Sequence, residues 1–215
     1  MEILIIGAVF AVLLLIVPGL LGRSRESMLA QYEILEKRFR LQRKTYPSKW
    51  GKGIGERYAL SGDFHGYPIS LYDHYRGSGQ SKETWTSLTL EMLFAGELEI
   101  VLERVDGGDL GARFARADSL MRVDAGLENF EVYTNSDTII ESLLNKSTCE
   151  QITEFQGMGC FRLSKGFFEY RESGQMGDAA MRIRFQEALR LLADLGDRLS
   201  ELKEVRDDRK NAFPS

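Results

Sequence analysis

The most hydrophobic stretch of the chain lies at its N-terminus, where Ile3 to Leu21 form a run of 19 residues without a charged side chain. A helix of that length measures about 28 Å, close to the ~30 Å hydrocarbon core of a bilayer, and it satisfies its own backbone hydrogen bonds in lipid. The pattern predicts a transmembrane helix over residues 1–22. The alternative is a cleaved signal peptide, which typically has a basic start and a small-residue cleavage site.

A helical spacing of apolar residues continues after this run. The residues that share the spacing of four, three and four are Met28, Tyr32, Leu35 and Phe39. Because no Gly or Pro occurs from Arg25 to about Lys44, we expect one amphipathic helix over that stretch. Tyr46-Pro47-Ser48 is expected to end it, since the residue before a proline disfavours helical angles. Residues 23–50 are therefore assigned to a basic neck helix and linker.

Strand-like alternation of apolar and polar residues begins near residue 57. It predicts four strands joined by short turns, Arg57–Phe64, Tyr67–Tyr75, Thr84–Met92 and Leu98–Arg104. Successive strands with short turns predict an antiparallel meander with one face in water. The polar, glycine-bearing stretch from Asp106 to Ala125 is expected to be a long connection.

The next part of the chain mixes short strands and short helices. A strand is predicted at Phe130–Tyr133, followed by a helix at Thr138–Leu144 with Asn135-Ser136-Asp137 as its cap. The other predicted elements are a helix over Ser147–Phe155 and a hairpin of Gly159–Leu163 and Phe167–Tyr170.

The C-terminal region has the clearest helical period. Its apolar residues are spaced 4, 3, 4, 3, 4, 3 and form a candidate helix seam of Met181, Phe185, Ala188, Leu192, Leu195, Leu199 and Leu202. Such a seam is typical either of a terminal helix that covers its own sheet or of a self-associating coiled coil. Both interpretations stay open on the sequence, and residues 208–215 are expected to be a frayed tail.

These elements together predict an α+β protein. Its parts are an N-terminal transmembrane helix, the neck, and a domain over residues 51–207 in which an antiparallel β-meander plus a second hairpin is covered by a long C-terminal helix. A body of this size can bury about 70% of its unfolded surface, enough for one independent core.

Charge is strongly segregated along the chain, although the net charge is only −4. Between Gly22 and Trp50 there are eight Lys or Arg and three Glu, a net charge of +5, and residues 51–215 carry −8. Basic flanks stay on the cytoplasmic side, which predicts a single-pass protein of the cell membrane with its N-terminus outside and its body in the cytoplasm. The candidate membrane-surface residues are Arg23, Arg25, Lys37, Arg38, Arg40, Arg43 and Lys44.

The neck has three possible arrangements. Its basic residues could lie on an anionic membrane surface, at about 1 kcal/mol of attraction per residue close to the lipid. The helix could also pair with a partner helix, or it could pack on its own domain with a solvated basic edge. The expected partners are the lipid bilayer and either a second copy or another membrane protein. Nucleic acid is excluded as a partner because a body charge of −8 repels phosphates.

Candidate chemistry in the sequence is weak. The glycines at positions 51–55 precede a strand instead of following one, which breaks the dinucleotide-binding arrangement. The segment Gly77-Ser-Gly-Gln-Ser-Lys82 lacks the order of a phosphate-binding loop. Two histidines (His65, His74) and two cysteines (Cys149, Cys160) have no compact metal-ligand spacing, and their number does not decide whether the cysteines pair. We therefore predict no cofactor, no metal and no catalytic residue.

The order of elements resembles a known group of proteins. The resemblance rests on the hydrophobic N-terminal run, the basic helix, the stretch from Ser61 to Tyr75 (SGDFHGYPISLYDHY) and the stretch from Phe130 to Asp137 (FEVYTNSD) before a Leu-rich closing helix. These features are similar to uncharacterised, single-pass, membrane-anchored bacterial proteins. The resemblance implies an inner-membrane protein and supplies no catalytic residues. Pleckstrin-homology-like domains, where strands are capped by a C-terminal helix, are a looser analogy.

The function expected from the sequence is a membrane-anchored, non-enzymatic binding or scaffolding module. The alternative is an enzyme with an unrecognised site that acts on lipid or cell-envelope material. A pocket joining Asp73, His74 and other titratable groups would favour the enzyme.

Overall fold

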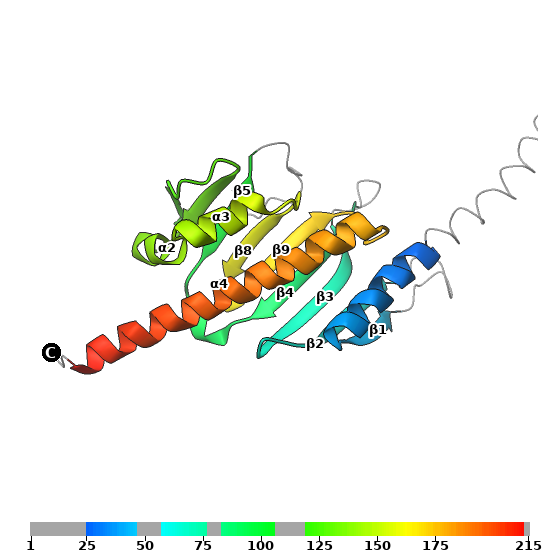
Figure 1. The fold of residues 1–215 in the computed structure, drawn as a ribbon, viewed down its shortest axis with the longest axis horizontal. Helices are drawn as coiled ribbons and strands as arrows, with labels where there is room; N and C mark the ends of the chain where they lie inside the picture. Colours follow the sequence, from blue (N-terminus) through cyan, green and yellow to red (C-terminus); the bar gives the residue numbers. More distant parts are fainter. Residues whose placement is uncertain (1–24, 47–56, 77–82, 106–118, 213–215) are drawn as a thin grey trace, which may run out of the picture.

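A nine-stranded antiparallel sheet is the centre of the computed structural model, which describes residues 25–46, 57–76, 83–105 and 119–212 (Figure 1). The strands follow the order β1-β2-β3-β4-β9-β8-β5-β7-β6 across the sheet. Their bounds are β1 Gln42–Tyr46, β2 Arg57–Phe64, β3 Tyr67–Arg76, β4 Glu83–Glu91, β5 Ile100–Arg104, β6 Met121–Val123, β7 Phe130–Thr134, β8 Cys160–Ser164 and β9 Phe167–Ser173. The α+β class and the antiparallel sheet predicted from the sequence are confirmed.

The helices lie on one side of this sheet. They are a helix over residues 25–39, α2 (Asp137–Leu143), α3 (Lys146–Glu154) and the long α4 (Ala179–Ala212), with a short 3-10 turn η2 at Leu93–Ala95. Figure 1 shows α4 running diagonally across the sheet, with α2 and α3 on one side of it and the helix over 25–39 on the other. The long C-terminal helix predicted from the apolar period is confirmed.

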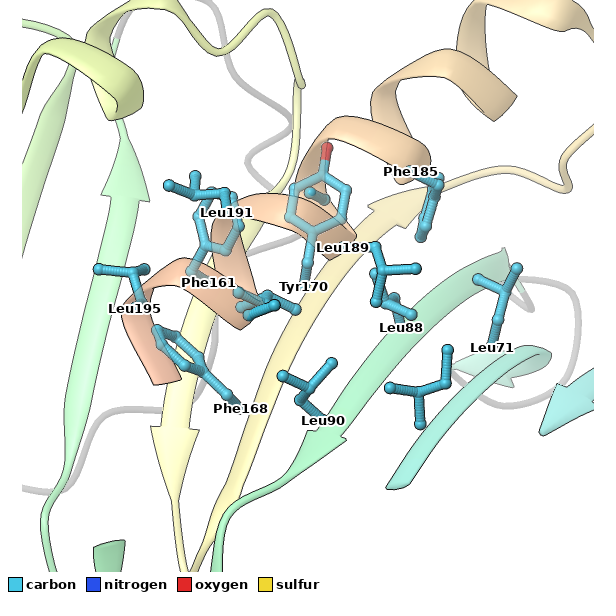
Figure 2. Close-up of a cluster of buried hydrophobic side chains, with 14 of the residues drawn as sticks. Leu71, Leu88, Leu90, Phe161, Phe168, Tyr170, Phe185, Leu189, Leu191 and Leu195 are labelled. Atoms are coloured by element: carbon cyan, nitrogen blue, oxygen red, sulfur yellow. The ribbon is translucent and has the colours of Figure 1, made fainter. Parts of the chain in front are cut away.

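The apolar stripe of α4 packs on the sheet of its own chain. Figure 2 shows Phe185, Leu189, Leu191 and Leu195 facing apolar side chains of the sheet such as Phe168. In the candidate helix seam, six residues are buried in this core and Leu202 is partly buried against it: Met181, Phe185, Ala188, Leu192, Leu195, Leu199 and Leu202. The described chain therefore has the arrangement in which the helix covers its own sheet.

The helix over residues 25–39 also packs on this core, through buried Met28, Tyr32 and Leu35. The prediction that it continues to about Lys44 is wrong. Arg40 adopts a left-handed φ of 55°, and the Leu41 amide donates to the Glu36 carbonyl at 2.9 Å.

This bonding is a Schellman motif, which satisfies the last carbonyls and ends the helix. The residue in its left-handed position is Arg40 instead of the usual glycine, so the sequence carries no stop signal. Residues 42–46 then form β1, whose side chains are all exposed and which pairs with β2. The helix and the strand that follows it thus share one core and one sheet with the strands beyond residue 57.

The predicted meander is correct for β2, β3 and β4 but wrong for β5. The hairpin of β8 and β9 lies between β4 and β5, and β5 pairs with β7 and β8. The connection from β4 passes the turn of that hairpin, where the Met92 amide donates to the Gly166 carbonyl at 2.6 Å. Ala95-Gly96 therefore belongs to a crossing connection and not to a hairpin turn.

Two shorter predictions are also corrected. Residues 121–123, expected to lie in a connection, form β6 and pair with β7. Ser136 is the N-cap of α2 but makes no side-chain hydrogen bond there. Asn135 instead bonds the Glu99 amide and the Glu97 carbonyl, so it joins the start of α2 to the strand region before β5.

Two predicted turns are confirmed. Phe64 to Tyr67 and Ser164 to Phe167 are two-residue hairpin turns in which both central residues have positive φ, 53° and 83° in the first and 52° and 77° in the second. This is the type I′ geometry, which matches the twist of antiparallel strands and favours glycine at the second position.

Among the described residues, no helix is long and apolar enough to cross a membrane. The span predicted over residues 1–22 lies outside the described part of the chain.

The packing of α4 gives a stability prediction. Leu195, 2% exposed, lies in the core, whereas Ile183 on the same helix is 45% exposed. Leu195→Asp should lower the free energy of unfolding by about 3–5 kcal/mol, because it places an unpaired carboxylate in an apolar contact. Ile183→Asp, the matched control, should change it by less than about 1 kcal/mol in urea unfolding. Equal effects of the two variants would exclude the packing shown in Figure 2.

Candidate functional site

The sheet has a second face, opposite the described helices (Figure 1). Residues of that face line a hollow of about 680 Å³. Strands β1, β2, β3, β4 and β9 line this hollow. Successive side chains of a strand point to opposite faces, so Ser70, Tyr72 and His74 of β3 lie on the hollow side while Ile69 and Leu71 are in the core.

Small side chains make the floor of the hollow. The strand register aligns Ser61 with Ser70, Ser70 with Thr89 and Thr89 with Glu169 across four adjacent strands. Ala59 lies beside this row, opposite both Lys44 and Tyr72. Larger side chains surround the floor: Lys44, Tyr46, Arg57, Tyr72, His74, Phe167 and Glu169. The hollow therefore follows from the distribution of small and large residues in the sheet register.

The polar groups of the hollow are arranged unevenly. Lys44 and Arg57 lie on β1 and β2, whereas Glu169 lies on β9 and accepts a hydrogen bond from the Ser87 hydroxyl at 2.7 Å. Burial, with a smaller contribution from the nearby Glu169 carboxylate, raises the pKa of Tyr72, so its phenol stays neutral and can donate a hydrogen bond. Among the residues that line the hollow, the two cations thus lie at one side and Glu169 at the other. Arg162 of β8 pairs with Glu169 in the strand register, and the charge of Arg171 on β9 acts to lower the pKa of Tyr72.

Asp73 is a buried carboxylate, 4% exposed, and its side chain points to the helix-covered face. Its Oδ1 accepts hydrogen bonds from the Tyr32 hydroxyl at 2.7 Å and from the Thr86 hydroxyl at 2.9 Å. Burial raises the pKa of Asp73 to about 6, although these two hydrogen bonds and the charge of Arg57 act in the opposite direction. The group links the helix over residues 25–39 to β3 and β4.

Asp73 and His74 do not form a catalytic pair. They are consecutive residues of β3, so Asp73 contacts Tyr32 in the core while the His74 ring lies 5.6 Å from the Tyr72 ring on the hollow side. Asp73 is among the residues that line the hollow, but its hydrogen bonds keep the carboxylate on the helix side. The contact that would favour an acid–base enzyme is absent for this pair.

A second buried carboxylate has a structural role. Arg184 of α4 donates two hydrogen bonds to Glu172 of β9, from Nε at 2.9 Å and from Nη2 at 2.5 Å. Glu172 also accepts a hydrogen bond from the Tyr170 hydroxyl at 2.8 Å. Burial, with the Glu172 carboxylate adding to it, raises the pKa of Tyr170 well above its usual value. This group fixes the first turns of α4 on the sheet.

The candidate basic residues are distributed over several surroundings. Arg23 lies outside the described residues. Lys37 pairs with Glu33 at 2.6 Å, Arg38 bonds Gln186 at 2.9 Å, and Arg43 lies 3.4 Å from Glu36. The remaining three are Arg25 near the Tyr58 hydroxyl, Arg40 at the helix end and Lys44 at the hollow. Their membrane contact stays a prediction.

The histidines and cysteines are likewise separated. His65 is in the turn between β2 and β3, His74 faces the hollow, and Cys149 is on α3. Cys160 belongs to a small buried cluster with Trp85 and Val101, and both cysteines are free thiols. Within the described residues no group of three or more His, Cys, Asp and Glu side chains could hold a metal ion. The glycine-rich segments at 51–55 and 77–82 lie outside those residues.

The hollow itself was not predicted from the sequence. Two features of the sequence point to this face: the polar character of every second residue in the predicted strands, and the position of His74 beside Asp73. These features indicate a wet face of the sheet and do not indicate which residues of distant strands come together on it.

The fold of the chain resembles that of a solved structure, whereas its sequence matches no known family. The chain matches no protein-family model and no curated protein. Among solved structures it is similar to the crystal structure of the mycobacterial trehalose monomycolate transport factor A, TtfA, with a TM-score of 0.53 and 13% sequence identity. The likeness covers 84% of this chain and 94% of TtfA. At this identity it shows a shared fold.

The raised pKa of Asp73 gives a pH prediction. Because the folded-state pKa is about 6 and the ordinary value is 3.8, the folded chain holds this proton more tightly than the unfolded chain. The stability contributed by protonated Asp73 is present below pH 4 and is lost as the pH rises towards 6. Asp73→Asn, which stays neutral, should therefore gain up to about 3 kcal/mol of stability relative to the native chain between pH 4 and pH 7.

The measurement is urea unfolding of both chains across this pH range. Asp63→Asn, which changes an exposed carboxylate on β2, is the control and should show no such relative gain. A difference between Asp73→Asn and the native chain that does not change with pH would mean that folding leaves the pKa of Asp73 at its ordinary value, and would contradict the prediction.

Proposed function

We propose that the chain is a membrane-anchored, non-enzymatic binding module that handles an envelope lipid from the cytoplasmic side. The observation that carries the proposal is the hollow of about 680 Å³ on the sheet face opposite the described helices. Its size lies within the range of small-ligand pockets, and its lining of aromatic, hydroxyl and cationic groups suits binding. The carboxylate with the mid-range pKa lies on the other face.

The fold likeness to a lipid transport factor supports this choice of ligand. TtfA is named for the transport of trehalose monomycolate, an amphiphile, and shares the fold over most of both chains. The uncharged run from Ile3 to Leu21 supports a membrane anchor, and the net charge of +5 after it supports a cytoplasmic body. A membrane protein partner or a second copy remains compatible with such a role.

The anchor and its orientation are tested together. The full chain with a C-terminal tag should stay in the membrane fraction after carbonate extraction, and protease added to intact spheroplasts should leave the tag uncut. Leu13→Arg should release much of the chain, because a cation at the centre of a span costs about 2.5–3.5 kcal/mol. Cleavage of the tag from outside would reverse the proposed orientation, and carbonate release of the native chain would remove the anchor.

Lipid binding is tested by co-purification. The full chain, extracted in detergent and purified, should retain a defined lipid that mass spectrometry detects at a ratio well above its abundance in the membrane. The comparison is an unrelated single-pass protein of similar size purified in the same way. A lipid profile identical to that of the comparison protein would contradict the proposed function.

A further inference from the structure

We infer that the hollow binds the headgroup of an anionic glycolipid, meaning a sugar or polyol ring that carries a negative charge. This inference rests on the proposed function and adds the chemistry of the ligand and the residues that recognise it. It is carried by the charge asymmetry of the hollow, by its length across the sheet and by its two aromatic rims.

The charge asymmetry selects an anion at one side and hydroxyl groups at the other. Lys44 and Arg57 lie on neighbouring strands and both line the hollow, and the Arg57 guanidinium also lies 5.8 Å from the Tyr75 ring. A phosphate or carboxylate that reaches both cations would receive charge-assisted hydrogen bonds. Glu169 lies at the far side and can only accept hydrogen bonds. It therefore suits a hydroxyl group of the ligand.

The length of the hollow favours a headgroup that contains a sugar or polyol ring. Strand β2, which carries Arg57, and strand β9, which carries Glu169, are separated by β3 and β4, a distance of about 14 Å at the usual strand spacing. A glycerol phosphate headgroup is too short to reach both sides, whereas a ring with its charged substituent extends further. The hydroxyls of Ser61 and Ser70 on the floor and the neutral phenol of Tyr72 add hydrogen-bonding groups along this path.

The rims of the hollow favour a lipid over a free sugar. Tyr46 on β1 and Phe167 on β9 both line the hollow and are 48% and 47% exposed. Aromatic side chains that are half in water are typical of membrane interfaces, where one part of the ring meets apolar material. The two rings can therefore contact the start of the acyl chains while the headgroup occupies the floor.

The local charge also favours an anionic lipid. The body carries −8 overall, but β1 has two cationic residues, Arg43 and Lys44, and no acid. Two copies pairing antiparallel along β1 would bring these like charges against each other, which disfavours a second copy at this edge. An anionic ligand, in contrast, would be attracted to the cationic side of the hollow.

The test measures lipid affinity of the full chain in detergent micelles by thermophoresis. Dioctanoyl phosphatidylinositol supplies a ring and a charge and should bind at least tenfold more tightly than dioctanoyl phosphatidylglycerol or a neutral glycosyl diglyceride. Lys44→Gln/Arg57→Gln should weaken that binding at least tenfold. The control, Lys146→Gln/Lys203→Gln, removes the same charge from exposed positions outside the hollow and should leave the affinity unchanged.

The outcomes separate this inference from the proposed function. Glu169→Gln should reduce the preference for the inositol lipid over the glycerol lipid. The variants compared are those whose melting temperature lies within a few degrees of that of the native chain. Lipid binding that is unaffected by the hollow variants would overturn the inference and leave the proposed function intact. Equal affinity for soluble inositol 1-phosphate would overturn the lipid as the source of the headgroup. Absence of binding to every lipid would contradict both.

Discussion

Burial of the α4 apolar stripe on one face of the sheet is the constraint on which the rest of the structure depends. Leu192 and Leu195, in the middle of the helix, are buried in one core cluster whose members come from strands across the sheet, from Leu60 of β2 to Val132 of β7. The helix over residues 25–39 covers the neighbouring strands on the same side. The described helices all lie on that face. On the opposite face small residues such as Ser61 and Ser70 leave a hollow, and Trp85, Val101 and Cys160 form a separate buried cluster.

Strict alternation along β3 also places an acid in the core. His74 faces the hollow, so Asp73 must face the helices, where burial penalises its charged form. Tyr32 and Thr86 compensate part of that cost through hydrogen bonds at 2.7 and 2.9 Å. The same hydrogen bonds join the first described helix to the middle of the sheet, which explains how one polar group can be retained among apolar neighbours.

Sequence patterns predicted the elements whose side chains alternate between core and water and missed those that backbone pairing alone defines. Strands β2, β3 and β4 carry apolar residues at every second position, so their period is visible. Strand β1 has the sequence QRKTY, and all its side chains are exposed. It therefore has no alternation of apolar and polar residues from which a strand could be predicted. The position of β5 depends on its pairing with β8, some 60 residues later in the chain. The local sequence Ala95-Gly96 is typical of a hairpin turn and therefore predicts the wrong neighbour for β5. The hollow depends on registers between distant strands in the same way.

The charge pattern has a different meaning in three dimensions. Along the sequence, the basic residues up to Lys44 form a neck separate from an acidic body. In the fold, Lys44 lies opposite Ala59 and lines the hollow together with Arg57, so a basic residue assigned to the neck belongs to the same sheet face as residues of the body. The rest of the basic set is partly neutralised, as in the Lys37–Glu33 and Arg43–Glu36 pairs. Lys44 and Arg57 give a cationic character to the side of the hollow where β1 and β2 meet, although the body as a whole is acidic, and this suits an anionic ligand.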